Sequence, residues 1–430
     1  MKRPFAPAAA IAAALTLAGL PAGAVEWGGT LNNTTTPIYS GTSQEVSFQQ
    51  EDKLALWLEA ELNPRLSLTI QGSYTYDLDR PYLFDVDILR LQGRYPLRGS
   101  SVLEFNLGRF RTADFSALLF SDNLDGTQVS WRSAKANLTL TVGFLGLQLM
   151  PVSTVSMSWA DINSTSLLAP PRLLEMLQAE LPELLGRQSL VMALVAQQDL
   201  RSEDQLLAEG PALEVIGQGG RLGTEYLGLA LRGPLAGALY YDLFGYLGTG
   251  RTLSYIGGAY SYEWALSGLV GAGLRYFNEQ WLSSNAELRL LLATGDEDFA
   301  DSFIEGNRSG LATVFSTISQ PELTLLFSPR LGNIVLAEAS YSLKPAAVLQ
   351  TLLKATLFLR PTLGPVSDAR VDSASSSRYL GTEVELIARV RLFSDLGLAF
   401  TAGAFLPGDA FQAAYREPDF GARIELSFSF

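Results

Sequence analysis

The sequence contains no cysteine and no histidine. Without cysteine the chain has no disulfide framework and no thiolate chemistry. Without histidine it has no imidazole metal ligand, no histidine general base and no serine–histidine pair. These absences weigh against catalysis, so we predict a protein that is not an enzyme and that uses no cofactor and no metal.

After its first residues the chain also lacks a long apolar run. Lys2 and Arg3 precede an apolar stretch from Ala8 to Leu20, and Ala22–Ala24 supplies the small residues that a signal peptidase requires. We therefore predict a signal peptide at residues 1–24. No later stretch approaches the roughly 20 apolar residues of a spanning helix, so we expect export without a helical anchor.

Positive charge is in deficit, with 31 basic against 44 acidic residues. This balance argues against a nucleic-acid partner. Hydrophobic residues make up 47% of the chain, which by itself would fit a large soluble core. They alternate with polar residues, however, and that period is typical of strands with one apolar face.

The last eleven residues show this alternation most clearly. Phe420, Ile424, Leu426, Phe428 and Phe430 share one parity, and the other parity is polar. A strand of about ten residues with one apolar face fits a wall between lipid and water. It resembles the closing strand of bacterial outer-membrane barrels, whose terminal aromatic is recognised by the barrel-assembly machinery.

Similar segments recur roughly twenty times, so we predict an all-β fold, a single transmembrane antiparallel β-barrel of about 18 strands (roughly 16–20) over residues 25–430. Short connections such as Asn63–Arg65 alternate with long ones such as Phe110–Leu124. We expect the short set in the periplasm and the long set outside. Candidate strands in the second half include Leu235–Leu247, Thr252–Glu263, Leu266–Phe277, Leu311–Ile318 and Glu322–Ser328.

The sequence pattern of the insert at residues 150–188 predicts a helix in an extracellular loop, and it is the only helix that we predict in the barrel. Prolines at Ala169–Pro171 suit a first turn, and leucines then recur at helical spacing, although Pro182 interrupts them. Two interpretations stay open, a helix packed on the barrel rim and a lid that enters the pore. The second makes a candidate gate of Leu173, Leu174, Leu177 and Leu181.

The polar parity of the strands carries charges. Because Arg or Lys facing lipid costs about 2–4 kcal/mol near the midplane, this parity should face the lumen. These charges either pair across strands and hold the wall open, or some stay free and select a solute. The candidate pore-lining residues are Arg90, Arg94, Glu287, Arg289, Glu383, Glu385, Arg389, Arg391, Arg423 and Glu425.

One acidic loop offers a different chemistry. Asp296, Asp298, Asp301 and Glu305 could supply oxygens to Ca²⁺. Asn307 stands where an EF-hand loop has its last glutamate, so we expect a solvated loop.

Two motifs resemble the alginate-export family of outer-membrane barrels. Leu292–Asp296 ends a strand before the acidic loop, and the Gly-Thr-Glu strand Leu380–Leu386 is followed by Pro407-Gly408. The resemblance implies a barrel of about 18 strands whose pore conducts a carbohydrate polyanion through a basic constriction. The luminal faces of this chain show no evident basic excess.

The sequence therefore predicts a monomeric channel of the bacterial outer membrane for passive diffusion of a polar or charged solute, with a saccharide as one candidate. The expected partners are outer-membrane lipid, a small polar or anionic solute and the assembly machinery, with no nucleic acid. One alternative is a surface-exposed structural protein or adhesin with a plugged barrel. Another is a FadL-like transporter of hydrophobic molecules, for which Val25–Lys53 shows no convincing hatch.

Overall fold

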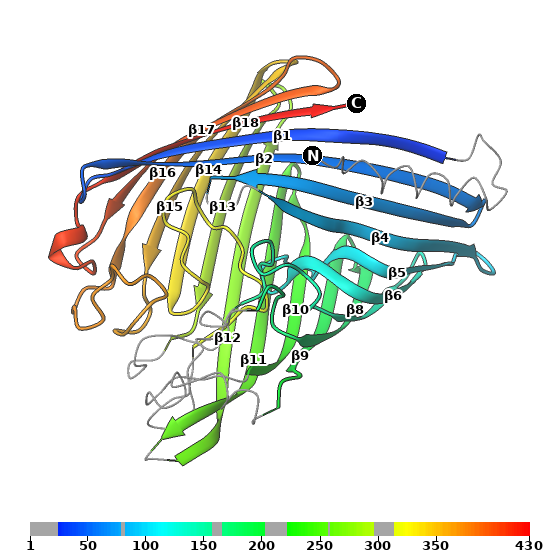
Figure 1. The fold of residues 1–430 in the computed structure, drawn as a ribbon, viewed down its shortest axis with the longest axis horizontal. Helices are drawn as coiled ribbons and strands as arrows, with labels where there is room; N and C mark the ends of the chain where they lie inside the picture. Colours follow the sequence, from blue (N-terminus) through cyan, green and yellow to red (C-terminus); the bar gives the residue numbers. More distant parts are fainter. Residues whose placement is uncertain (1–24, 79–81, 157–165, 203–221, 257–258, 296–313) are drawn as a thin grey trace, which may run out of the picture.

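The computed structural model describes residues 25–78, 82–156, 166–202, 222–256, 259–295 and 314–430, which form one closed sheet of 18 antiparallel strands (Figure 1). Each strand pairs with its neighbours in sequence, and the first pairs with the last. The predicted barrel is confirmed. The strands are β1 (Val25–Ser40), β2 (Glu45–Asn63), β3 (Leu66–Asp77), β4 (Leu83–Pro96), β5 (Val102–Ala113), β6 (Ser121–Arg132), β7 (Asn137–Phe144), β8 (Arg172–Leu185), β9 (Gln188–Asp199), β10 (Leu222–Ala236), β11 (Leu239–Ile256), β12 (Ala259–Asn278), β13 (Ser284–Ala293), β14 (Ile334–Ala346), β15 (Leu349–Leu359), β16 (Tyr379–Arg391), β17 (Leu396–Pro407) and β18 (Asp419–Ser429).

Strand β18 faces outward with its apolar parity, as the sequence predicts. Phe420, Ile424 and Phe428 are exposed on the outer surface, whereas the Arg423 guanidinium points inward to Glu322 at 2.7 Å. Because the sheet closes on itself, it leaves no unpaired edge in the membrane region.

Closure depends on β1, which the sequence did not predict. Residues Thr30–Tyr39 pair with β18, and the main chains of Gly29 and Phe430 exchange two hydrogen bonds of 3.0 Å. A side chain at position 29 would overlap the ring of Phe430. The polar run Asn32–Thr36 lacks the apolar and polar alternation that predicts a wall strand, because asparagine and threonine occupy both of its faces.

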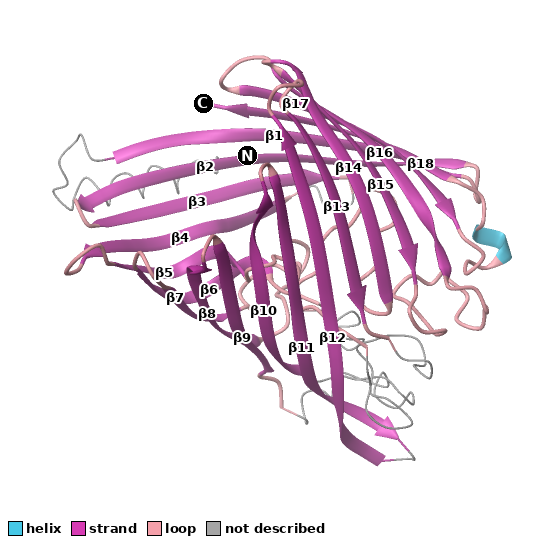
Figure 2. Ribbon diagram, turned by 180° about the vertical axis from the view of Figure 1, so that it is seen from behind, coloured by secondary structure: helices cyan, strands magenta, loops and turns pink. Residues whose placement is uncertain are grey.

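The connections alternate in length around the barrel (Figures 1 and 2). Short turns such as 64–65, 133–136 and 347–348 share one end of the barrel, here called the turn end. Longer connections such as 114–120 and 360–378 leave the opposite end, here called the loop end. The helical structure in the described residues is a short 3-10 turn at Ala413–Tyr415, and no helix there is long and apolar enough to cross a membrane.

The predicted helix and gate are wrong. Arg172–Leu185 is wall strand β8, paired with β7 and β9. Leu173, Leu177 and Leu181 lie on its outward parity, and Leu174 is fully buried on the inward parity. Leucines occupy both parities because lipid covers one face and inner loops cover the other, and the sequence therefore mimics an amphipathic helix.

Three further strand assignments fail for related reasons. The predicted strand Leu311–Ile318 has residues 311–313 outside the described part of the chain, and its residues 314–318 belong to a connection that folds inward. The same connection contains all of the predicted strand Glu322–Ser328. Thr252–Glu263 is not a separate strand, since it combines the end of β11 with the start of β12. The acidic residues from Asp296 to Glu305 also lie outside the described residues.

Candidate functional site

Three connections from the loop end meet inside the barrel. They are residues 114–120, 150–156 and 314–333, here called the constriction loops (Figure 1). The amide of Ile318 donates to the carbonyl of Leu119 at 2.9 Å, and the amide of Ser156 donates to the carbonyl of Ile318 at 2.8 Å. These bonds join the three loops into one body, because buried main-chain groups must be paired.

An apolar core fixes the constriction loops to the wall. Leu119, Phe120, Phe315 and Ile318 are fully buried, and the ring of Phe315 packs edge-on against Tyr226 of β10 with centroids 5.8 Å apart. The inner face of this part of the wall is correspondingly apolar. Its buried residues include Leu174, Met176, Val195, Leu269, Leu291 and Leu336.

Glu383 holds the end of the third constriction loop. Its carboxylate accepts hydrogen bonds from the Thr324 hydroxyl at 2.7 Å and from the amides of Leu326 and Phe327 at 2.9 Å. The ring of Phe327 stacks on Phe405 with centroids 4.7 Å apart. Glu383 therefore lies on the inward parity, but its buried carboxylate binds the loop instead of lining open space.

The β15–β16 connection, residues 360–378, is built around buried Arg360. Its guanidinium donates to the carbonyls of Ser377 at 3.0 Å, Gly364 at 2.6 Å and Asp372 at 3.1 Å, and to that of Ser375. Burial lowers the pKa of the Arg360 guanidinium. The amide of Asp372 also donates to Ala410, which ties this connection to the one that carries Phe411.

Most of the predicted pore-lining charges are paired on the inward parity. Glu385 binds Lys354 at 2.7 Å, and Arg94 lies 3.4 Å from Glu104. Arg90 donates to the hydroxyl of Thr69 at 3.4 Å. These contacts are cross-strand pairs of the kind that stabilise a sheet.

The remaining predicted charges gather around two cavities near the turn end. A cavity of about 720 Å³, here called the arginine cavity, lies between the first constriction loop and the turn end of the barrel. Its charged lining comprises Arg187, Arg232, Arg275, Arg289, Asp242 and Glu287. A second cavity of about 760 Å³, here called the turn-end cavity, is lined by Lys53, Lys344, Arg389, Arg391, Glu51, Asp395 and Glu425.

The arginine cavity has four cations and two carboxylates. Arg275 binds Glu287 at 2.9 Å and Arg232 binds Glu180 at 3.2 Å. Among the described residues, Arg187 and Arg289 make no ion pair. A local basic excess therefore exists in a lumen whose strand faces are balanced overall. Arg232 follows the strand parity and could have been found in the sequence, but Arg187 lies in a turn and could not.

Residues 217–418 match the alginate-export family model. No curated protein sequence matches. Among solved structures, the chain is similar to Pseudomonas aeruginosa OccK2 (OpdF) in complex with glucuronate, at 13% identity and a TM-score of 0.57, over 94% of this chain and 98% of that one. It is also similar to the P. aeruginosa outer membrane protein opdK, at 11% identity and a TM-score of 0.55, over 94% and 98%.

The alginate-export match contains most of the arginine cavity. Arg232, Asp242, Arg275, Glu287 and Arg289 lie within it, whereas Arg187 precedes it. The match to the alginate-export family thus covers five of the six charged residues that line the arginine cavity. The structural similarity establishes the shared barrel fold alone, because the identities are only 11% and 13%.

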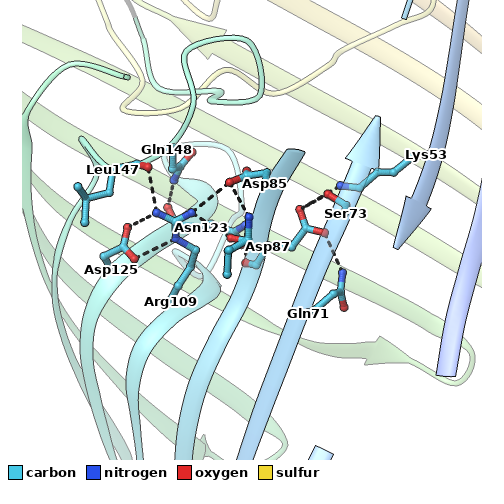
Figure 3. Close-up of polar contacts among 11 residues, drawn as sticks. Lys53, Gln71, Ser73, Asp85, Asp87, Arg109, Asn123, Asp125, Leu147 and Gln148 are labelled. Atoms are coloured by element: carbon cyan, nitrogen blue, oxygen red, sulfur yellow. Dashed lines mark hydrogen bonds and ion pairs between the residues drawn. The ribbon is translucent and has the colours of Figure 1, made fainter. Parts of the chain in front are cut away.

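Outside the alginate-export match, a polar network closes the wall between β4 and β5. Their pairing ends at Leu89 and Arg109. Beyond it, the Arg109 guanidinium binds Asp125 at 2.8 and 2.9 Å, Asp85 at 3.3 Å and the carbonyl of Leu147 at 3.0 Å (Figure 3). Figure 3 also shows Asp87 accepting hydrogen bonds from Lys53, Gln71 and Ser73.

Replacing Arg109 with alanine should destabilise the barrel by about 3 kcal/mol, because two poorly hydrated carboxylates lose their partner. Urea unfolding in detergent, followed by circular dichroism, measures this change. Arg111→Ala is the matched control, since Arg111 is exposed on the same strand. Equal stability of the two variants would show that the network does not stabilise the wall between β4 and β5.

Proposed function

We propose that the protein is a channel of the bacterial outer membrane through which small polar solutes, preferentially anions, diffuse passively as through a monomeric porin. The observation that carries the proposal is the arginine cavity, which places four guanidinium groups below the constriction loops. Such groups concentrate anions because a low-dielectric wall focuses their field. Passage requires no catalytic group, so the protein is proposed not to be an enzyme.

A sugar acid is the solute class that this lumen suits best. Arg289 offers a cation without an ion pair to a described residue, and β3 and β4 contribute partly exposed polar groups, the hydroxyl of Ser67 and the amide of Gln92, to the inward parity. A carboxylate with several hydroxyls complements both surfaces. The complex of OccK2 with glucuronate supports this proposal by analogy of fold.

Anion selectivity tests the proposal. In planar bilayers the protein should show discrete conductance steps, and the reversal potential in a salt gradient should report preferential anion passage. Arg289→Gln should lower the ratio of anion to cation permeability by about threefold, since it removes one luminal charge and breaks no ion pair between described residues.

Arg416→Gln is the control, because Arg416 lies in the β17–β18 connection, where its exposed side chain binds main-chain carbonyls. A barrel with no conductance would contradict the channel. In that case the apolar core between the constriction loops and the wall would favour the alternative of an adhesin with a plugged barrel. Loss of surface attachment in a deletion strain would then support the adhesin.

A further inference from the structure

A row of leucines crosses five strands on the outward face of the barrel. Leu140 of β7 pairs with Leu177 of β8, which pairs with Leu194 of β9. The row continues through Leu227 of β10 to Leu247 of β11. All five side chains are exposed, so this row belongs to the surface that contacts acyl chains.

One level closer to the loop end, two carboxylates stand on the same outward face. Glu175 of β8 and Glu225 of β10 both pair with Ala196 of the intervening strand β9. Since neighbouring strands lie about 4.8 Å apart, their α-carbons are about 10 Å apart. The methyl group of Ala196 leaves the space between them open.

The glutamates and the leucine row line a shallow groove of about 600 Å³. Both glutamates are exposed, and among the described residues neither carboxylate has an ion pair or a side-chain hydrogen bond. Arg251 pairs with Gly223, two residues further toward the loop end, and does not line the groove. The groove therefore combines an apolar floor with unpaired negative charge at its loop-side end.

Charge and polarity together specify the occupant. Carboxylates on a lipid-facing surface are unfavourable unless water or a cation reaches them. An ammonium group seated between Glu175 and Glu225 would pair with both, and an acyl chain attached to it would run along the leucines. We propose that this groove docks a lipid with an ammonium head group, independently of what passes through the lumen.

Native mass spectrometry of the full barrel in detergent tests the proposal. The probes are phosphatidylethanolamine and phosphatidylglycerol with identical acyl chains, offered in equal amounts at low salt. We expect a roughly fivefold preference for phosphatidylethanolamine, as two partly exposed ion pairs would give, and a weaker preference at high salt.

Two variants separate charge from shape. Glu175→Gln combined with Glu225→Gln should abolish the preference, and Ala196→Leu should abolish it with both charges intact. Glu61→Gln, which removes an exposed carboxylate on the inward parity, should keep it. No preference in the native protein, or a preference that survives the double variant, overturns the proposal. Capture of oligolysine without any lipid preference would identify a protein-binding surface and overturn it equally.

Discussion

Glu383→Ala is expected to raise single-channel conductance about twofold and to increase open-channel noise. The substitution leaves the amides of Leu326 and Phe327 without their acceptor, whereas the Thr324 hydroxyl can still donate to the carbonyl of Phe327. Each unpaired buried donor costs about 1–3 kcal/mol, so the loop gains by leaving its site and exposing these groups to water. Once the loop leaves, the lumen beside β16 is no longer filled.

Planar-bilayer recordings measure this effect, and Glu61→Ala is the control because Glu61 is an exposed inward carboxylate that does not contact the constriction loops. The conductance of Glu383→Gln should lie between those of the native protein and Glu383→Ala, since an amide oxygen can still accept from one or two of the donors. Conductance unchanged in Glu383→Ala would mean that the Phe327 stack and the apolar core hold the loop without Glu383.

Arg360→Met is expected to loosen the whole β15–β16 connection while the barrel stays folded. Four carbonyls lose a charged donor, at about 1 kcal/mol or more each, and this loss makes local opening of the connection easier. Trypsin should then cleave after Arg370 or Arg378 at least about tenfold faster, which is the effect of roughly 1.4 kcal/mol on local opening.

The thermal unfolding midpoint of the barrel should change little, because the strand hydrogen bonds are untouched. Arg416→Met serves as the control, since the Arg416 side chain is 46% exposed and lies in the β17–β18 connection. A cleavage rate equal to that of the native protein would show that the links of this connection to Asp419 and Ala410 maintain its conformation without Arg360.

Sequence alone could predict strands whose inner face meets water. In β16 and β18 the lipid side is apolar and the lumen side carries Glu383, Glu385 and Arg423, so period two is unmistakable. In β8 the constriction loops, and not water, cover the lumen side of the strand. Inward Leu174 is therefore buried, while its neighbour Leu173 lies on the lipid side. The alternation disappears there, because whether a lumen position is wet depends on loops that are distant in sequence.

The candidate site was predictable only one residue at a time. Strand parity places Arg289 and Arg391 on the lumen side, but parity does not show which charges share a cavity. Arg187 and Arg289 line the same cavity because the register of five successive strands brings them together. That register follows from turn geometry and bulges, which an isolated sequence does not reveal.

The apolar body formed by the constriction loops also limits how the wall can evolve. Strands β8 and β9 face lipid on one side and packed protein on the other, so neither parity can accept polar substitutions freely. The inner parity of β3, with Ser67, Thr69 and Gln71 toward the lumen, meets polar partners such as Arg90 and Asp87, so one polar residue can replace another there if a hydrogen-bond partner is kept. Substrate preference can therefore diverge through one arc of the barrel while the opposite arc keeps the constriction in place.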